Sequence, residues 1–387
     1  MSHDVEMKAL GFEFNPFPPA ATGVSFSEEI WLPDSWSEEL HRGINSLATG
    51  GGAKALTIVG EYGAGKTYVL QWLMMHVFRP RRILPFFFDN PGVAFYDLAN
   101  QLLRQVGRYE LSKSMWELLY RPETDSSLQG RLIDWTFKQW LAILGDPKVR
   151  KREVEHLAHS MRERALTDDE EVSFCFAQLI ADTKDRPYFE FRDFIPRLTN
   201  SLVPEREEAR YFVTVIRVLM QIFEASGVAF LIDEFEDVAL GRRLPKRQVS
   251  EYTATLRRLL DTARDEELWL ALSITPEGLE QTSRLEPALI QRFSTRFVIP
   301  RLSDSDAFDV VLHRLNEARS EGIRTDLWPF ENDVLLAMEE KNRSIPRKLI
   351  RILWQSLALA SQKGIEPPFS KSLIAEAEQL LSDETWR

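Results

Sequence analysis

The sequence predicts a doubly wound α/β fold with a five-stranded parallel sheet, an inserted helical subdomain and a C-terminal helical lid. Five short apolar runs of strand length are separated by long stretches with helical patterning. A glycine-rich turn follows the first run, and two carboxylates follow the third. The expected strands are 56–59, 82–89, 228–232, 268–274 and 296–299.

The first strand leads into a glycine-rich loop at 60–67, with the sequence Gly-Glu-Tyr-Gly-Ala-Gly-Lys-Thr. The loop fits the pattern G-x-x-x-x-G-K-[ST] in full, and the apolar stretch 68–77 after it contains no glycine or proline, as a helix requires. In this context backbone N–H groups surround phosphate oxygens, and the positive end of the helix faces them. We expect a nucleoside triphosphate to be bound by Gly60, Gly63, Ala64, Gly65, Lys66, Thr67 and Tyr68.

Two side chains of this loop have distinct expected roles. Lys66 reaches the β- and γ-phosphates, and Thr67 offers its hydroxyl to Mg²⁺. The alternative is a glycine-rich turn that carries an unrelated lysine. The strand before the loop and the helix after it favour the phosphate-binding loop.

The second strand contains Pro85, which cannot donate a ladder hydrogen bond and therefore predicts a position at the edge of the sheet. The third strand ends in Asp233 and Glu234. In a parallel sheet the carboxyl ends of the strands face the ligand. We expect Asp233 to hold Mg²⁺ and Glu234 to act as the general base for the attacking water. The alternative is an acidic helix cap after a strand.

Three further positions carry candidate catalytic side chains. Thr275 ends the fourth strand, where its hydroxyl can contact the lytic water or the γ-phosphate, or can simply begin the turn at the next proline. Arg347 begins a lid helix and can reach the γ-phosphate. Arg292 precedes the fifth strand and can reach a neighbouring subunit's nucleotide, with Arg296 as the second candidate. The alternative for each arginine is an exposed helix residue.

The spacing of the strands also predicts the domain organisation. Far more chain separates the second strand from the third than one crossover needs, and its middle part is charged and helical in pattern. We expect a nucleotide-binding core at 1–107 and 206–302, a helical insertion at 108–205, and a helical lid at 303–387.

Taken together, these motifs resemble the AAA+ ATPases of the origin-recognition-like group, which includes the secretion ATPase ExeA and the transposition ATPase TniB. The segment 11–17, Gly-Phe-Glu-Phe-Asn-Pro-Phe, is similar to the opening of that group. The segments 275–279, 289–293 and 299–303 resemble its passage from the fourth strand to the fifth. The resemblance implies bound ATP and Mg²⁺, the sheet order 5-1-4-3-2, and adenine near the N-terminal segment and lid. Thr275 stands where relatives often carry Asn or Gln.

A second resemblance is to the ATP-binding proteins of BREX phage-defence systems, through the start of the phosphate loop and the long insertion before Asp233. Because 40 residues follow Arg347, we expect no winged-helix domain after the lid.

Composition narrows the function classes. The single cysteine, Cys175, excludes an intramolecular disulfide and fits a reducing compartment. No apolar run is long enough to span a membrane, and the N-terminus lacks the pattern of a secretion signal, so we expect a cytoplasmic protein. The net charge of −11 argues against coating nucleic acid with the whole surface.

Basic clusters nevertheless interrupt the acidic chain. The cluster after the third strand can hold a DNA backbone, or can be a solvated loop paired with nearby carboxylates. Its members are Arg242, Arg243, Lys246 and Arg247.

The expected function is an ATPase that forms a homo-oligomer on binding ATP and acts on double-stranded DNA or a DNA-bound complex, as in mobile elements or phage defence. The alternative is an ATP-dependent switch that binds a protein partner through its helical insertion, without nucleic acid. A secretion ATPase is disfavoured by the lack of a membrane span.

Overall fold

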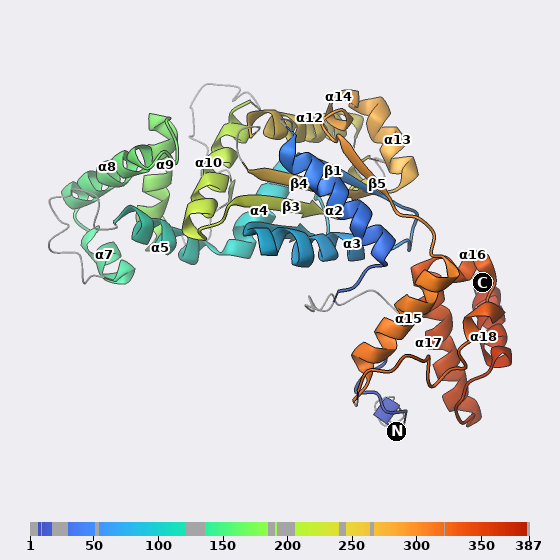
Figure 1. Cartoon of the computed structure of the whole chain (residues 1–387). Helices are drawn as coiled ribbons and strands as arrows, with labels where there is room; N and C mark the ends of the chain where they lie inside the picture. Colours follow the sequence, from blue (N-terminus) through green and yellow to red (C-terminus); the bar gives the residue numbers. More distant parts are fainter. Residues whose placement is uncertain are drawn as a thin grey trace. The chain divides into compact units, whose positions relative to one another are not determined.

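The computed structural model forms two compact units (Figure 1). One unit comprises Met1–Gly43, Ile58–Met75 and Phe297–Arg387, and the other comprises Ile44–Thr57 and His76–Arg296. The structure describes residues 7–8, 10–17, 30–50, 54–120, 136–184, 190–191, 206–239, 245–263, 267–320 and 322–384.

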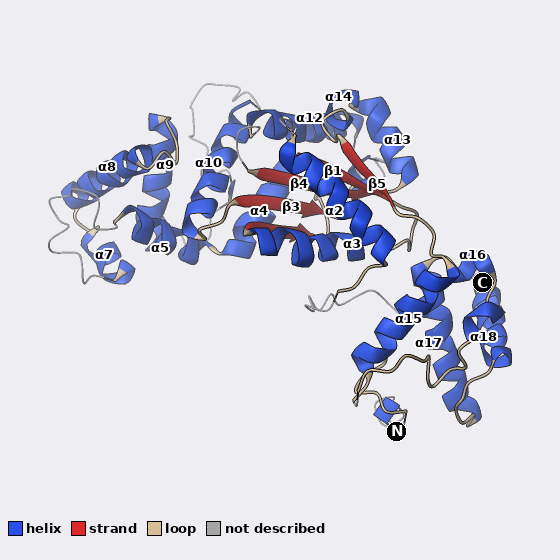
Figure 2. Ribbon diagram, in the orientation of Figure 1, coloured by secondary structure: helices blue, strands red, loops and turns tan. Residues whose placement is uncertain are grey.

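Five strands form one sheet in the order β2-β3-β4-β1-β5, which is the predicted order 5-1-4-3-2 (Figure 2). The fold class and every predicted strand are therefore confirmed, with boundaries that differ by at most two residues. The strands are β1 (Lys54–Val59), β2 (Ile83–Phe88), β3 (Gly227–Ile232), β4 (Leu268–Ile274) and β5 (Thr295–Val298).

The centre of the larger unit is the pairing of β3 with both neighbours. β3 is parallel to β2 and to β4, and the register sets Phe88 beside Ile232 and Ile232 beside Leu272. Every residue of β3 and β4 is buried. Continuous apolar runs of this kind are what a parallel strand covered on both faces requires.

Pro85 lies in β2 at the edge of the sheet, as its missing N–H predicted. Its register partner on β3 is Ala229. The aromatic residues of the same strand pack inward: the rings of Phe88 and Phe230 meet edge to face with centroids 5.7 Å apart.

Helices follow the strands of this unit. They are α4 (Phe95–Val106), α10 (Arg206–Ile222), α11 (Glu236–Ala239), α12 (Lys246–Thr262), α13 (Pro276–Leu285) and α14 (Pro287–Ile290). The stretch predicted as an insertion is helical where described: α5 (Arg108–Leu119), α7 (Phe137–Ile143), α8 (Pro147–Glu163), α9 (Glu170–Ala181) and the 3₁₀ turn η3 (Asp182–Lys184). The division into core, insertion and lid stays a prediction.

A buried carboxylate joins three of these insertion helices. Glu153 of α8 is 2% exposed. It accepts a hydrogen bond from the Tyr120 hydroxyl at the end of α5 and one of 3.1 Å from Trp140 Nε1 of α7. A buried carboxylate is costly without partners, and here two donors from other helices satisfy it.

The smaller unit holds the helix after the phosphate loop and the C-terminal helices. Its elements include α3 (Lys66–Trp72), α15 (Asp304–Ala318), η5 (Val334–Ala337), α16 (Glu340–Arg343), α17 (Pro346–Lys363) and α18 (Lys371–Glu384). Four elements cross between the two units: α2 (Asp34–Thr49), the π-helix η1 (Leu73–Phe78), β1 and β5. The 3₁₀ turn η2 (Arg79–Arg81) follows η1.

The N-terminal segment packs on the C-terminal helices of this unit. Phe17 is fully buried, and its ring lies 6.1 Å from that of Phe330. Phe12 forms an antiparallel bridge with Arg319, and the Glu13 N–H donates to Ala318 O at 2.7 Å. The segment 11–17 thus packs across the end of α15 and the chain that follows it.

We expect Glu153→Ala to loosen the insertion, because the Tyr120 hydroxyl and the Trp140 N–H would lose their shared acceptor. Leaving buried donors unsatisfied costs about 1–3 kcal/mol each. Hydrogen–deuterium exchange of peptides from α5, α7 and α8 should show that the free energy of local unfolding falls by a similar amount. Glu155→Ala is the control, because Glu155 is exposed and pairs with Lys151 at 3.9 Å. Equal exchange in both variants would contradict the role of Glu153.

Candidate functional site

The phosphate loop adopts a backbone that only glycine takes readily. Gly63 has φ +79° and Gly65 has φ +100°. Gly65 is also the N-cap residue of α3, which begins at Lys66. Residues with a Cβ are strained in this region, so the glycines at these two positions are required by the turn itself.

Lys66 is buried against its own loop. Its side chain donates from Nζ to Gly60 O at 3.1 Å and lies 5.3 Å from the centre of the Tyr62 ring. Lys66 is 8% exposed, whereas Tyr62 is 65% exposed. A Cβ at Gly60 would lie 3.4 Å from Lys66 Cγ and 3.2 Å from Ile299 Cδ1, so the loop leaves little room beside the lysine.

The phosphate loop contacts the start of α17 within the same compact unit. The Arg347 N–H donates to Gly63 O at 3.2 Å. A Cβ at Gly63 would lie 2.8 Å from Arg347 Cβ, which is closer than atoms can pack. Arg347 therefore sits directly over the loop, and this proximity is what its predicted role requires.

Tyr68, the residue directly after the loop, contacts two distant parts of this unit. Its hydroxyl accepts a 3.2 Å hydrogen bond from the Trp31 N–H, and the Arg314 guanidinium lies 5.4 Å from its ring centre. Trp31 also stacks on His313 of α15 with ring centroids 5.7 Å apart. Burial raises the pKa of Tyr68, and the charge of Arg314 partly opposes that rise. The sequence analysis did not identify Trp31, His313 or Arg314, since only folding brings them to Tyr68.

The acidic pair after β3 is held by hydrogen bonds from both neighbouring strands. The Asp233 N–H donates to Phe88 O of β2 at 2.8 Å. On the other side, the Ser273 hydroxyl of β4 donates to Asp233 Oδ1 and accepts a 3.1 Å bond from the Glu234 N–H. Asp233 is 4% exposed, whereas Glu234 is exposed and has a left-handed backbone with φ +52°.

Thr275 caps a helix. It is the N-cap residue of α13, and its hydroxyl accepts a 3.1 Å hydrogen bond from the Gly278 N–H. A Cβ at Gly278 would lie 3.0 Å from Glu236 Cβ, so the turn is closely packed. The cap corresponds to the alternative that the sequence left open, and contact of Thr275 with the lytic water stays a prediction.

Arg292 is engaged in a two-pronged ion pair. Its Nε and one terminal nitrogen lie 2.6 and 3.1 Å from the two carboxylate oxygens of Asp261 on α12. The hydrogen bond from Asp261 raises the pKa of Arg292. Arg296, the second candidate, is exposed on β5.

The basic cluster after β3 is only partly described. Arg242 and Arg243 lie outside the described residues, and so does the side chain of Lys246, which begins α12. Arg247 is exposed and pairs with Glu251 at 2.7 Å one turn along α12. This pair agrees with the solvated alternative for the last member of the cluster.

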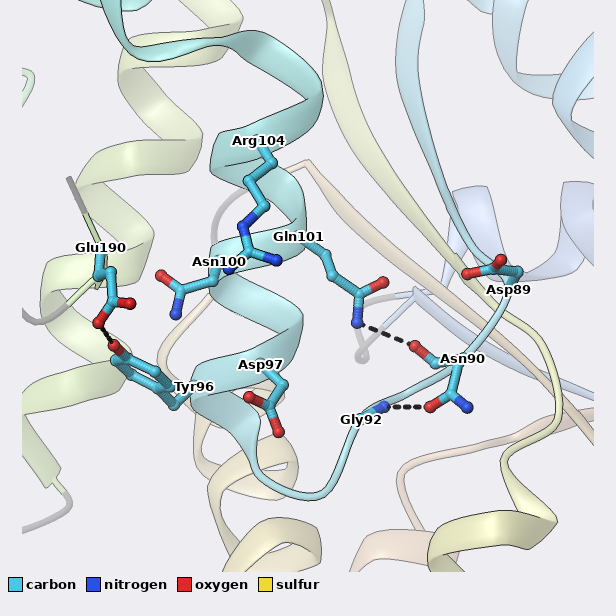
Figure 3. Close-up of a pocket in the computed structure, with 9 residues that line it drawn as sticks. All are labelled: Asp89, Asn90, Gly92, Tyr96, Asp97, Asn100, Gln101, Arg104 and Glu190. Atoms are coloured by element: carbon cyan, nitrogen blue, oxygen red, sulfur yellow. Dashed lines mark hydrogen bonds between the residues drawn. The ribbon is translucent and has the colours of Figure 1, made fainter. Parts of the chain in front are cut away.

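A polar pocket of about 470 Å³ opens where β2 ends (Figure 3). Its lining residues are Asp89, Asn90, Gly92, Tyr96, Asp97, Asn100, Gln101, Arg104 and Glu190. Several of them pair with one another: the Tyr96 hydroxyl donates to Glu190, and Gln101 Nε2 donates to Asn90 O at 3.0 Å. The sequence analysis did not predict this pocket, since it depends on Glu190 approaching α4 from a distant part of the chain.

No protein-family model matches the chain. A stretch of 91 residues is 25% identical to an uncharacterized HTH-type transcriptional regulator of Methanocaldococcus jannaschii, and covers 24% of this chain. The chain spans about a fifth of that curated relative (22%).

Solved structures with a similar fold include two proteins of Aeropyrum pernix. The ORC2 protein in its ADPNP–ADP complexes is 14% identical, with a TM-score of 0.47, covering 92% of this chain and 70% of that one. The ORC1 protein in complex with DNA is 12% identical, with a TM-score of 0.43, covering 93% and 68%. The fold assignment here rests on the strand order of the sheet, which is the order that the resemblance to AAA+ ATPases implied.

Among the described residues, every helix is too short or too polar to cross a lipid bilayer.

We expect Gly63→Ala to destabilise the protein by about 1–3 kcal/mol more than Gly322→Ala, because overpacking costs that much. Both glycines have positive φ, but a Cβ at Gly322 meets nothing within 4 Å, whereas one at Gly63 overlaps Arg347. Urea unfolding without nucleotide measures the difference. Equal losses in the two variants would contradict the contact between the loop and α17.

Proposed function

We propose that the chain is an AAA+ ATPase that binds ATP with Mg²⁺ at the phosphate loop and hydrolyses it with Glu234 as the general base. The observation that carries this proposal is the loop at 60–67. Its Lys66 is buried over the loop, Gly63 and Gly65 have positive φ, and the loop contacts Arg347 of α17. These features together fit a cradle for phosphates with a sensing arginine above it.

The strand order supports action of the loop and the acidic pair on one nucleotide. β1 and β3 are the two neighbours of β4, and the loop follows β1 while Asp233 follows β3. Ligands of open α/β sheets bind at the carboxyl ends of such strands. A buried carboxylate and a hydroxyl are hard oxygen ligands of the kind Mg²⁺ prefers, so Asp233 and Thr67 would hold the metal beside the β- and γ-phosphates.

Glu234 is suited to the base because its side chain is exposed at the end of a buried strand. Its backbone N–H is anchored to Ser273, so the carboxylate starts from a fixed point. Thr275 would orient the water from the end of β4, and Arg347 would neutralise γ-phosphate charge.

Arg292 is proposed to act on the nucleotide of a neighbouring subunit in a homo-oligomer. In this chain it is held by Asp261, and the two side chains are 36% and 45% exposed. Ion pairs this exposed contribute about 0–1 kcal/mol, so a phosphate can displace the carboxylate at little cost. Asp261 would thus hold Arg292 until the nucleotide of a neighbouring subunit displaces the carboxylate.

The proposed target is double-stranded DNA or a DNA-bound complex, of the mobile-element or phage-defence type, in the cytoplasm. The support is the basic cluster 242–247, which follows the acidic pair closely in the sequence. The pair of Arg247 with Glu251 is exposed, and an ion pair of this kind contributes about 0.3–0.5 kcal/mol.

The second candidate is a switch that binds a protein partner through the helical insertion. The favouring observation is a pair of exposed aromatic side chains, Tyr109 on α5 and Phe174 on α9, which are 44% and 43% exposed. Helices α5 and α9 pack against each other. The first candidate would be favoured by salt-sensitive DNA binding that charge reversal of Arg242 and Arg243 abolishes. A chain that binds no DNA would favour the second candidate.

We expect Lys66→Ala to lose ATP binding, whereas Glu234→Gln binds ATP with normal affinity and hydrolyses it about 10²–10⁴-fold more slowly, the usual contribution of a general base. Equilibrium binding of a fluorescent ATP analogue and phosphate release measure the two effects. Glu277→Gln, an exposed residue in the first turn of α13, is the control and should behave like the wild type. Normal binding by Lys66→Ala, or full turnover by Glu234→Gln, would overturn the corresponding assignment.

We expect Arg292→Ala to bind ATP normally but to lose the part of hydrolysis that rises with protein concentration, because each site lacks its neighbour's arginine. Arginines that act on a neighbouring subunit's nucleotide raise the rate of hydrolysis by about 10³–10⁵-fold. The comparison is Arg284→Ala, an exposed arginine paired with Glu280 on α13. A rate that stays concentration-dependent in Arg292→Ala would move the role to Arg296 or remove it.

A further inference from the structure

Ser273 stands out because it is a fully buried hydroxyl in an otherwise apolar strand. The sequence of β4 is Leu-Trp-Leu-Ala-Leu-Ser-Ile, and every residue in it is buried. Ser273 itself is 0% exposed. A buried hydroxyl without a hydrogen bond is costly, and an alanine would fit the strand with less loss. The hydroxyl is therefore kept in this strand by its hydrogen-bond partners.

Those partners are the two residues assigned to metal binding and catalysis. The hydroxyl donates to Asp233 Oδ1 and accepts the Glu234 N–H at 3.1 Å. The direction is fixed, because a carboxylate only accepts and a backbone N–H only donates. The Ser273 carbonyl also accepts the Phe235 N–H at 3.1 Å. One residue thus binds three consecutive residues of the turn after β3.

Two other buried hydroxyls make a different kind of contact. Ser356 is also 0% exposed, but its hydroxyl donates to Ile352 O one turn back in α17. Thr253 does the same toward Val249 O in α12. Such local bonds satisfy the hydroxyl within its own helix. Ser273 instead reaches across to the next strand, to a carboxylate and to a backbone with positive φ.

The contact has consequences for both acidic residues. A hydrogen bond to one oxygen of a carboxylate fixes the rotation of the group and therefore the direction of its other oxygen. Asp233 is 4% exposed, so bulk water cannot replace that bond easily. Glu234 has φ +52°, and its anchored N–H holds this unfavourable backbone in place.

We propose that Ser273 is a positioning residue that aims the Asp233 carboxylate at the nucleotide-bound metal and fixes the backbone from which Glu234 acts. This inference rests on the proposed function of the same site and adds a residue that no motif predicted. Ser273 itself touches neither substrate nor metal. Its loss should weaken metal binding by the nucleotide complex and slow hydrolysis, while metal-free nucleotide binding stays unchanged.

The test measures Mn²⁺ binding in the presence of a non-hydrolysable ATP analogue. Electron paramagnetic resonance reports the concentration of free Mn²⁺. We expect Ser273→Ala to bind Mn²⁺ about tenfold more weakly, the usual effect of losing a group that orients a metal ligand. Binding of the analogue in EDTA should change less than about twofold, within the spread of surface substitutions. Ser356→Ala removes a hydroxyl of equal burial and should leave Mn²⁺ affinity at the wild-type value.

Ser273→Cys is a second variant that tests the same contact if Ser273→Ala fails to fold. The thiol keeps the side chain in place but is a weak donor and acceptor, so this variant should also lose Mn²⁺ affinity. Unchanged Mn²⁺ affinity in folded Ser273→Ala or Ser273→Cys would overturn the inference and leave the ATPase proposal standing. A wild-type chain that binds neither the analogue nor Mn²⁺ with it would overturn the ATPase proposal and this inference together.

Discussion

The turn after β3 depends on hydrogen bonds from the strands on both sides of it. Phe88 O receives the Asp233 N–H, and Ser273 binds the next two N–H groups and the Asp233 carboxylate. Because β3 is parallel to β2 and β4 in fixed register, these acceptors can occupy only one place relative to the turn. The apolar burial that sets the register therefore also sets the direction of the acidic side chains. At this turn, the strand register that stabilises the core also determines the geometry of the site.

The phosphate loop is built on a second constraint, which acts within the other compact unit. Positive φ at Gly63 and Gly65 curls the loop, and the absence of a side chain at Gly63 lets Arg347 approach. Trp31, in the chain before α2, adds a further fixed contact, because its N–H donates to the Tyr68 hydroxyl just after the loop. The loop thus contacts α17 directly, and the residue that follows the loop contacts Trp31. Under the proposed function, these contacts would couple a bound nucleotide to α17 without a long chain of intermediates.

The sequence was sufficient for the strands and the two motifs, because these follow from local patterns, whereas the order of the strands came from the resemblance to AAA+ ATPases. Apolar runs, a glycine spacing and one proline at an edge strand are readable in a window of a few residues. Ser273 was missed for the opposite reason. In the sequence it is one polar residue in a strand, and its importance comes from residues 40 positions away, across a register that only the fold fixes. The same holds for Trp31 beside Tyr68 and for Glu153 beneath Trp140. The Thr275 cap was readable locally, and the sequence offered it as one of two interpretations.

The backbone of Glu234 strengthens the functional reading of the acidic pair. A glycine or asparagine at this position would adopt φ +52° at lower cost, so the turn alone gives no reason for a glutamate. A non-glycine residue held in this region costs about 1–3 kcal/mol and persists where the surroundings determine it. Here the surroundings do so through Ser273, while the carboxylate itself is exposed and contributes little to packing. The proposed role as general base for phosphoryl transfer gives such a reason, because Glu234 lies at the end of a buried strand, next to a carboxylate of fixed direction.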